Sequence, residues 1–327
     1  MGQIISRSFA FSLLFFPLAS IASNIQSQFQ KDLERNFAAA IILTDSDVLT
    51  FGFHDFDPND WFDLKNENIG TEDSINLRKK IAVTILPYTF DLSDDDAVNK
   101  HQISVRLSSL VVDQNVEIDS NYSDDRHREL VAGLGVEYEY IQALNEDWSM
   151  NWGIGTHIQY YRSRYDYGSE VLDPIKDIVD GVIVNTSAWA TVIEPNIEFK
   201  YEQPKDWGKW TFKSRLNYFY GFGWGDANNG HIGNPEGWFV SNGLAAFYDF
   251  DQWGRAVQSV YSSIRRVDIG GDASTPFGTS HYYEGSIGWL MTPPFETDLI
   301  DNVGIGLNIN YGSNLKGGSI ILFFNQD

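Results

Sequence analysis

The sequence predicts an all-β fold: a transmembrane, antiparallel, up-and-down β-barrel of about twelve strands, with a short N-terminal amphipathic helix. Three observations predict it. Many segments alternate apolar and polar residues, long polar connections alternate with short ones, and tryptophans recur directly after short connections. Alternation gives a strand one apolar and one polar face, and long loops at one end with short turns at the other are typical of membrane barrels.

The first 22 residues have the order of a secretory signal peptide. Arg7 is the only charged residue before Lys31, and it precedes an apolar core over 9–16 and small residues that include Ser20 and Ala22. Charge, apolar core and small residues in this order indicate a cleaved signal. The core is too short to cross a bilayer as a helix, which takes about 20 apolar residues. We therefore expect a signal peptide over 1–22 and export of the chain.

Residues 23–40 carry the one convincing helical pattern. An apolar residue recurs every four positions, at Ile25, Phe29, Leu33 and Phe37. Residues with this spacing share one face of a helix. From about residue 39 the period changes from near four to two, so we expect the helix to end at 40 and a barrel to occupy 41–327.

The barrel strands are expected where the period is two. The clearest begins at Trp148, where Trp152 and Ile154 fall on one face and Asn151 and His157 on the other. In the third strand the alternation slips at Ser109 to Leu110, as a β-bulge would cause. The twelve expected strands are 41–53, 75–90, 101–113, 128–142, 147–163, 185–201, 207–222, 236–249, 254–267, 280–291, 301–311 and 316–324.

The polar faces of the strands carry charged residues, and these decide which face of each strand points to the lipid and which to the lumen. A Lys or Arg that faces lipid near the membrane midplane costs about 2–4 kcal/mol, whereas one that faces a wet lumen costs little. In hydrocarbon every backbone amide needs a partner within the protein, so the sheet must close. The polar residues expected to face the lumen are Arg106, Glu137, Glu139, Asn151, His157, Glu194, Glu198, Lys200, Lys213 and Arg215.

Aromatic residues gather at the ends of the expected strands. Trp148, Trp207 and Trp253 each follow a short connection directly. Tryptophan and tyrosine favour the water–lipid boundary, where one end of the ring system is wet and the other apolar. We therefore expect two aromatic girdles, formed by Trp148, Trp207 and Trp253 at one boundary and by Tyr160, Tyr220, Trp238 and Tyr283 at the other.

The C-terminus carries a pattern typical of the last strand of outer-membrane barrels. Lys316, Gly318, Ile321 and Phe323 fit the order polar–x–Gly–x–x–apolar–x–aromatic. We interpret these four residues as an assembly signal. The pattern departs from the usual form because residues 325–327 follow the aromatic residue.

Together, the signal peptide, the N-terminal helix, the twelve strands and this terminal pattern resemble the solitary outer-membrane autotransporter-type β-barrel family. The resemblance covers the whole chain after the signal and implies the outer membrane of a Gram-negative bacterium. It also implies a helix in the lumen and no exported passenger, because about 18 residues separate the cleavage site from the first expected strand. Self-cleaving autotransporters cut at an Asn pair, but this helix has only the isolated Asn24 and Asn36. The implied partners are outer-membrane lipid, lipopolysaccharide, the barrel assembly machinery and periplasmic chaperones.

Composition excludes several classes of function. The chain has no cysteine, so disulfides, thiolate metal sites, thiol nucleophiles and lipoprotein anchoring are excluded. A formal net charge of −22 argues against nucleic-acid binding, which needs Lys and Arg to neutralise phosphates. We expect no cofactor and no resident metal.

Five segments were weighed as candidate chemistry. Residues 124–127, with Asp and His two apart in an expected external loop, resemble part of an omptin protease site. His157 and His281 lack the nucleophile motif that a phospholipase would need. The acidic run 55–60 lacks the spacing of a calcium loop, and the glycines of 221–225 lack the lysine and helix of a phosphate loop. None is expected to be catalytic.

The leading hypothesis is an outer-membrane barrel of the translocator type without a passenger, with a structural or surface role or restricted passage of small solutes. One alternative is an open, porin-like diffusion channel, and another is an outer-membrane surface hydrolase. A secreted soluble propeller is a fourth class, but the sequence shows no repeat of about 40–50 residues, which a propeller requires.

Overall fold

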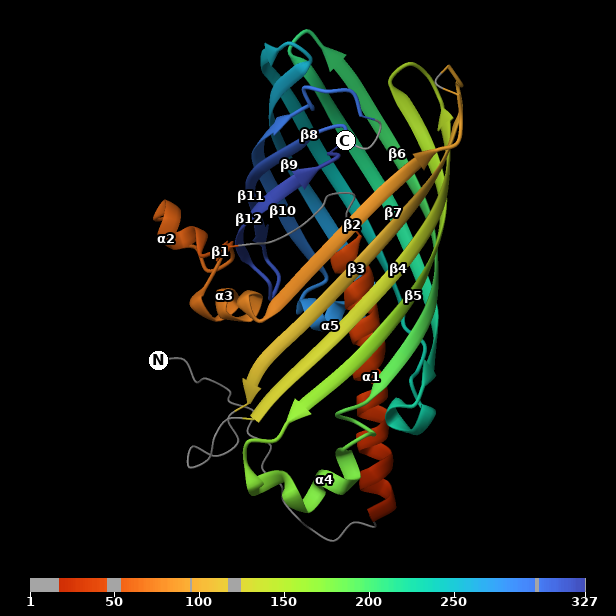
Figure 1. Ribbon diagram of the computed structural model, residues 1–327, viewed down its shortest axis with the longest axis vertical. Coiled ribbons are helices and arrows are strands. Elements are labelled where there is room, and N and C mark those ends of the chain that lie inside the picture. Colours follow the sequence, from red (N-terminus) through yellow and green to blue (C-terminus); the bar gives the residue numbers. More distant parts are fainter. Residues whose placement is uncertain (1–17, 46–53, 95, 117–124, 298–299, 327) are drawn as a thin grey trace.

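Twelve antiparallel strands roll into a barrel around one long helix in the computed structural model (Figure 1). The structure describes residues 18–45, 54–94, 96–116, 125–297 and 300–326. The strands are β1 (His54–Phe56), β2 (Ile81–Asp91), β3 (Lys100–Val116), β4 (Asp125–Ala143), β5 (Trp148–Asp166), β6 (Ser187–Lys205), β7 (Gly208–Gly225), β8 (Glu236–Trp253), β9 (Ala256–Gly271), β10 (His281–Met291), β11 (Val303–Tyr311) and β12 (Gly317–Phe324).

Neighbouring strands of the wall are neighbours in the sequence. From β2 to β12 each strand pairs antiparallel with the next, and β1 pairs with β12. The strands β3 to β9 are 16 to 19 residues long, which exceeds the roughly 9–11 residues needed to cross a membrane. The connections after β3, β5, β7 and β9 lie at one end, which we call the loop end. The opposite end, the turn end, has turns of two to four residues after β4, β6 and β8 and longer connections after β2 and β10.

The seam of the barrel lies between β12 and β2. Among the described residues, β2 pairs only with β3, and the short β1 continues the sheet beyond β12. Helix α3 (Glu72–Lys79) joins β1 to β2. Its Arg78 donates to Asp55 of β1 at 3.0 Å and to the carbonyl oxygen of Leu315 at 2.6 Å. Side-chain contacts therefore hold this part of the seam together.

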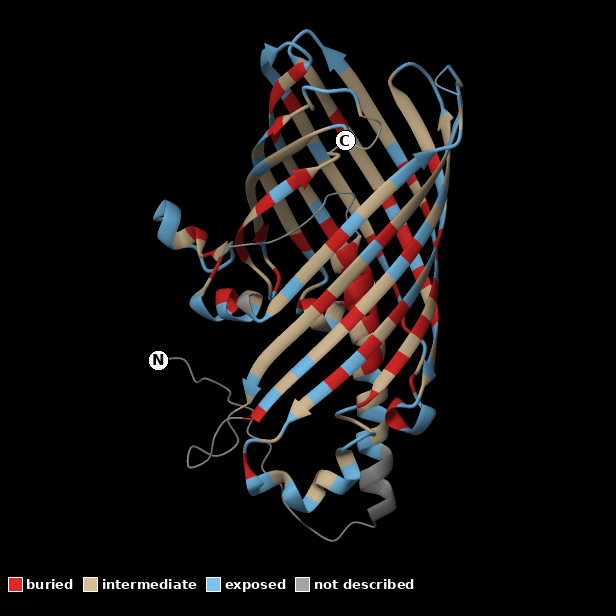
Figure 2. Cartoon of the chain, in the orientation of Figure 1, coloured by how far each residue is buried: buried red, intermediate tan, exposed pale blue. Residues whose placement is uncertain are grey.

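The wall has an apolar outside and a largely polar inside, as the alternation predicted. On β4, Leu134 and Val136 point outward and are exposed. On β5, Trp152 and Ile154 are exposed, whereas Asn151, on the opposite side of the same strand, is buried. Figure 2 shows this banding along the strands. The exposed apolar band is the surface that lipid covers in a transmembrane barrel.

Helix α1 (Leu18–Thr44) runs inside the barrel, with its N-terminal part emerging at the loop end (Figure 1). The remaining helices lie in connections: α2 (Pro58–Phe62) and α3 beside β1, η1 (Glu170–Leu172) and α4 (Asp173–Val179) after β5, η2 (Ala227–Gly230) after β7, and α5 (Ser274–Phe277) after β9. No helix in the described part of the chain has both the length and the apolarity that a membrane-crossing helix requires.

Three local predictions were wrong, although the strand count of twelve is confirmed. Helix α1 continues to Thr44, so the first strand, expected over 41–53, is helical over 41–44; residues 46–53 lie outside the described chain, and β1 covers only 54–56. The second expected strand, 75–90, begins with the end of α3. The bulge expected at Ser109 is absent, because β3 and β4 pair without a break; the register shifts instead on β8, between Asp249 and Asp251.

Candidate functional site in the barrel lumen

Helix α1 packs tightly against the inner wall at the loop end. Leu33 and Phe37 are completely buried, and the run 38–42 is buried as well. Phe37 meets Tyr161 of β5 edge to face, with ring centroids 6.2 Å apart. The inward wall residues of this core are Leu110, Val131, Tyr161, Ala188, Ala190, Val192, Phe219, Phe239, Val267, Ile269 and Tyr282. Apolar contacts from many strands therefore hold the helix in place.

Polar contacts hold the upstream part of α1 to the connection after β7. The side-chain amide of Gln26 donates to the carbonyl oxygen of Asn228 at 3.2 Å, and the amide of Asn228 donates back to the carbonyl oxygen of Gln26 at 2.9 Å. Further along, the carboxylate of Glu34 accepts from the backbone N–H of Asn234 at 3.0 Å. These bonds fix the depth of the helix relative to the loop end.

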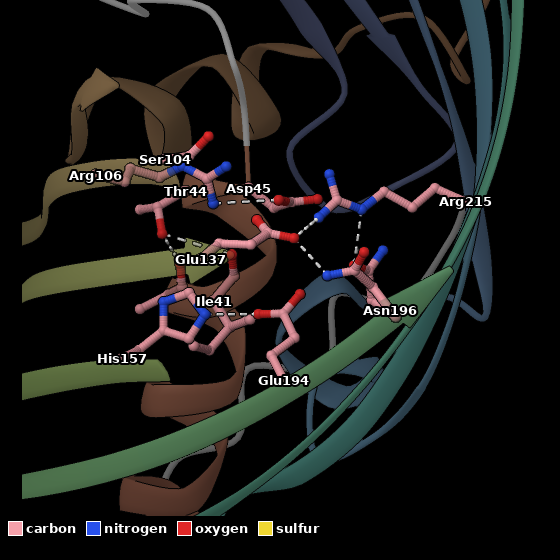
Figure 3. A network of polar contacts seen from close by, with 12 residues as sticks. Ile41, Thr44, Asp45, Ser104, Arg106, Glu137, His157, Glu194, Asn196 and Arg215 are labelled. Carbon is pink, nitrogen blue, oxygen red and sulfur yellow. Dashed lines mark hydrogen bonds and ion pairs between the residues drawn. The ribbon is translucent and has the colours of Figure 1, made fainter. Parts of the chain in front are cut away.

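A polar network surrounds the C-terminal end of α1 (Figure 3). Arg106 of β3 forms an ion pair with Asp45 at 3.2 Å, and both side chains are largely buried. Glu137 of β4 forms an ion pair with Arg215 of β7. A cation near the last turn of a helix is favourable because the helix dipole is negative there. Arg106 therefore stabilises the end of the helix as well as the charge of Asp45.

The same network continues across β5 and β6. The ring nitrogen Nε2 of His157 lies 2.8 Å from the carboxylate of Glu194, and Asn151 donates to Glu198 at 3.2 Å. Asn196 donates to Glu137, which links the two halves of the network. Buried charges are tolerated when they are paired and hydrogen-bonded in this way.

A cavity of about 330 Å³ lies between the end of α1 and the turn end of the barrel. Charged residues that line it include Asp45, Lys213, Arg265 and Glu284, and Phe323 contributes apolar surface. Pockets of about 300–1,000 Å³ hold small molecules. The turn-end half of the lumen thus contains a cavity with charged groups in its wall, whereas the loop-end half is packed around α1.

Simple geometry explains why a single helix fills the loop-end half. Twelve strands, spaced about 4.8 Å apart and tilted by about 40°, enclose a backbone cylinder about 24 Å wide. Inward side chains occupy several ångströms on each side, and a helix with its side chains is about 10–12 Å across. Little room is left between the helix and the wall.

The structure places all ten polar residues expected in the lumen on the inner side of the wall. Five are buried: Arg106, Asn151, Glu194, Glu198 and Arg215. The side chains of Glu137, Glu139 and His157 are each less than 15% exposed. Lys200 pairs with Glu202 at 3.1 Å, and Lys213 lines the cavity.

The residues expected to form aromatic girdles lie at the two ends of the strands. At the turn end, Trp148 packs on Tyr201, Trp207 lies near Tyr248, and Trp253 is exposed. At the loop end, Tyr160 packs on Trp189, Tyr220 on Phe222, Tyr283 on Tyr311, and Trp238 is exposed. Trp189 and Trp224, which were not predicted, stack with ring centroids 5.3 Å apart and extend the loop-end belt.

The four residues of the terminal pattern lie at or in β12. Lys316 immediately precedes the strand, and Gly318 pairs with Phe56 of β1. Ile321 and Phe323 are buried on the inner side of the wall, where Phe323 packs edge to face on Tyr261. Leu322, between them, faces outward.

Residues 124–127, which resemble part of an omptin site in sequence, do not form an exposed Asp–His pair in the described part of the chain. Asp124 lies outside the described residues, and Asp125 is buried and accepts from the backbone N–H groups of Gly168 and Ser169. His127 points its Nε2 at the hydroxyl of Ser163, 3.0 Å away. The described part of the chain contains no group of three His, Asp or Glu side chains arranged to hold a metal ion.

Sequence reasoning missed Thr44 and Asp45 at the end of α1. Both fall in the first expected strand, 41–53, because the helical period is lost in the apolar residues that precede them. The hydroxyl of Thr44 donates to the carbonyl oxygen of Ala40 at 2.6 Å, one turn back along the helix, so this polar side chain is satisfied within the last turn. The pairing of Thr44 with a helix carbonyl had no signal in the sequence.

Comparisons with known proteins give a family match and several solved structures with low sequence identity. The family model described as the solitary outer membrane autotransporter β-barrel domain matches residues 34–326. Among solved structures, the chain is similar to the β-domain of the Bordetella autotransporter BrkA, with 12% identity, a TM-score of 0.45, and coverage of 75% of this chain and 88% of that one. It is also similar to LpxR from Salmonella typhimurium (12% identity, TM-score 0.39, 74% and 86% coverage) and to a FadL homologue from Pseudomonas aeruginosa (10% identity, TM-score 0.38, 75% and 65% coverage).

No curated protein sequence matches the chain. The family match spans most of the barrel and part of α1, and proteins with this domain are located in the outer membrane of Gram-negative bacteria. The chain belongs to the solitary outer membrane autotransporter β-barrel domain family.

Proposed function

We propose that this protein is a helix-plugged outer-membrane barrel, with a structural or surface role and only restricted passage of small solutes. The observation that carries the proposal is the complete burial of Leu33 and Phe37 against the inner wall at the loop end. A helix held by apolar contacts on several strands blocks that half of the lumen. Solutes that enter the cavity at the turn end therefore have no wide path onward.

The open diffusion channel is the competing function, and planar-bilayer conductance distinguishes the two. The intact protein is expected to give small or rare steps, and deletion of residues 23–40 is expected to give large ones. Large, steady steps from the intact protein would contradict the plug.

A disulfide provides the matched control. The chain has no cysteine, so Gln26→Cys with Asn228→Cys introduces one pair at a place where the helix and the loop touch. Oxidation of this pair locks the helix without deleting any residue. The oxidised protein is expected to lose even the rare openings, and reduction is expected to restore them.

A surface hydrolase is the second candidate, and the contact between His127 and Ser163 favours it. A His that accepts the proton of a Ser hydroxyl is the first requirement of nucleophilic catalysis. Ser163 is, however, only 1% exposed, so substrate must displace neighbouring groups to reach it. The test is hydrolysis of peptides and chromogenic esters by the unmodified protein, His127→Ala and Ser163→Ala; an inactive unmodified protein would end this candidate.

A further inference from the structure

Four arginines gather on the outer face of the barrel at the loop end of β4 and β5. They are Arg126, Arg128, Arg162 and Arg164, which we call the outer arginine cluster, and all are exposed. Each lies on the same side of its strand as the lipid-facing residues, two or four positions beyond the last of them. Such a concentration of positive charge is unexpected in a chain with a net charge of −22.

The cluster contains an arrangement that is unfavourable without an anion. Arg128 and Arg164 lie directly opposite each other in the β4–β5 register, and like charges at such positions destabilise a sheet. Asp113 on β3 binds Arg126 at 2.6 Å and lies 3.8 Å from Arg128, while Asp166 lies 3.4 Å from Arg164. Three carboxylates, Asp113, Asp166 and the exposed Asp226 beside Arg162 and Arg164, against four guanidinium groups leave the face with a net positive charge.

An open hollow of about 550 Å³ adjoins the cluster. Its volume is within the range that holds a small ligand. Polar atoms make up most of its surface, and its lining includes Tyr160, Arg162, Arg164, Asn185, Ser187 and Asp226. The hollow offers hydrogen-bond donors beside two of the four guanidinium groups.

The height of the cluster matches the headgroup level of the membrane. Trp148 and Tyr160 are twelve residues apart on β5, and at about 3.4 Å per residue and a tilt of about 40° they are separated by about 30 Å along the barrel axis. The apolar band of such barrels is about 25 Å tall, with aromatic residues at its edges. Tyr160, Trp189 and Trp224 form the loop-end edge, and Arg162 comes next on the strand.

We infer that the outer arginine cluster binds the phosphorylated headgroup of a lipid in the outer leaflet, with the acyl chains lying on the apolar band below. Guanidinium groups bind phosphate through charge-assisted, often bidentate hydrogen bonds. The exposed Ile154 and Ile158 continue the same face of β5 toward the midplane, which favours a lipid over a soluble anion. This inference concerns the outside of the wall and does not depend on whether the lumen is plugged.

The test measures lipid binding to the purified full-length protein by native mass spectrometry and tryptophan fluorescence. The probes are bisphosphorylated lipid A, the same lipid with its phosphates removed, and inorganic phosphate. The unmodified protein is expected to bind the phosphorylated lipid most tightly. The double variant Arg162→Gln with Arg164→Gln is expected to weaken this binding about tenfold, since each exposed ion pair contributes a few-fold.

Arg266→Gln is the matched control. Arg266 is an exposed arginine on the outer face of β9, four strands from β5 in the sheet order, so it lies outside the cluster and its loss is expected to leave lipid binding unchanged. All variants must retain heat-modifiable gel migration, which reports a folded barrel, and Arg126→Gln with Arg128→Gln provides a second disruption if the first variant fails to fold.

Four results would overturn the inference. Equal affinity of the unmodified protein and both double variants for the phosphorylated lipid would show that the arginines do not bind it. Equal affinity for inorganic phosphate would identify a free anion as the ligand, and equal affinity for the dephosphorylated lipid would show that the phosphate is not recognised. Loss of binding in EDTA with no effect of the arginine variants would assign the lipid to carboxylates bridged by a divalent cation.

Discussion

Replacement of Phe37 by alanine should release the helix from the lumen. Phe37 is completely buried and packs against Tyr161, so its truncation removes contacts that the rigid wall cannot replace. A buried Phe→Ala substitution costs about 3–5 kcal/mol. If this cost falls on the docking of α1, the ratio of released to docked helix rises by about 10² to 4 × 10³, at about 1.4 kcal/mol for each factor of ten.

Single-channel recording in planar bilayers measures this ratio directly as the frequency of large openings. Ile25→Ala is the control, because Ile25 lies on the same face of α1 but is 45% exposed, and its loss is expected to change the opening frequency less than twofold. Both variants should remain heat-modifiable. An opening frequency for Phe37→Ala equal to that of the unmodified protein would refute the idea that apolar packing holds the plug.

Three further outcomes are expected. A spin label at Trp152 should be relaxed by a lipid-soluble agent and one at Asn151 by neither lipid-soluble nor freely diffusing aqueous agents, because the first side chain is exposed and the second buried. Asp45→Asn should destabilise the helix end by about 1.5–3 kcal/mol, since it removes a buried, charge-assisted hydrogen bond to Arg106, and limited proteolysis after residue 45 should report it. Burial and neighbouring carboxylates raise the pKa of Asp272, in the connection after β9, above its ordinary value. The protonated form of Asp272 therefore stabilises the fold at low pH, and this contribution is lost as pH rises through the folded-state pKa. Asp272→Asn should flatten the change in thermal stability between about pH 3 and about pH 7.

The wall of the barrel was predictable because lipid outside and water or polar groups inside impose a period of two on every strand. The alternation around Trp152 and Asn151 shows this, and the residues expected in the lumen lie on the inner side of the wall. Contacts between them were not predictable. The partner of Glu137 is Arg215, three strands away, and only the curvature, tilt and register of the rolled sheet bring the two together.

The end of α1 was mistaken for a strand for a physical reason. A helix that is surrounded by protein on all sides is apolar all round and loses its 3.6-residue period. Residues 38–42 are of this kind, and all are buried in the lumen. The inward apolar residues of the wall, such as Tyr161 and Phe219, have the same origin: they face the helix instead of water.

Polar contacts near both ends of α1 fix its position along the barrel axis. Apolar packing alone would allow the helix to slide, and these contacts prevent it. Gln26 and Asn228 are bonded at the loop end, and Asp45 and Arg106 at the other. Between Gln26 and Asp45 the helix rises by about 28 Å at 1.5 Å per residue. A shift of one turn, about 5.4 Å, would break both contacts and leave the charge of Arg106 buried without Asp45, which is strongly unfavourable. The helix therefore has one stable depth, and a solute path past it requires its release instead of a small displacement.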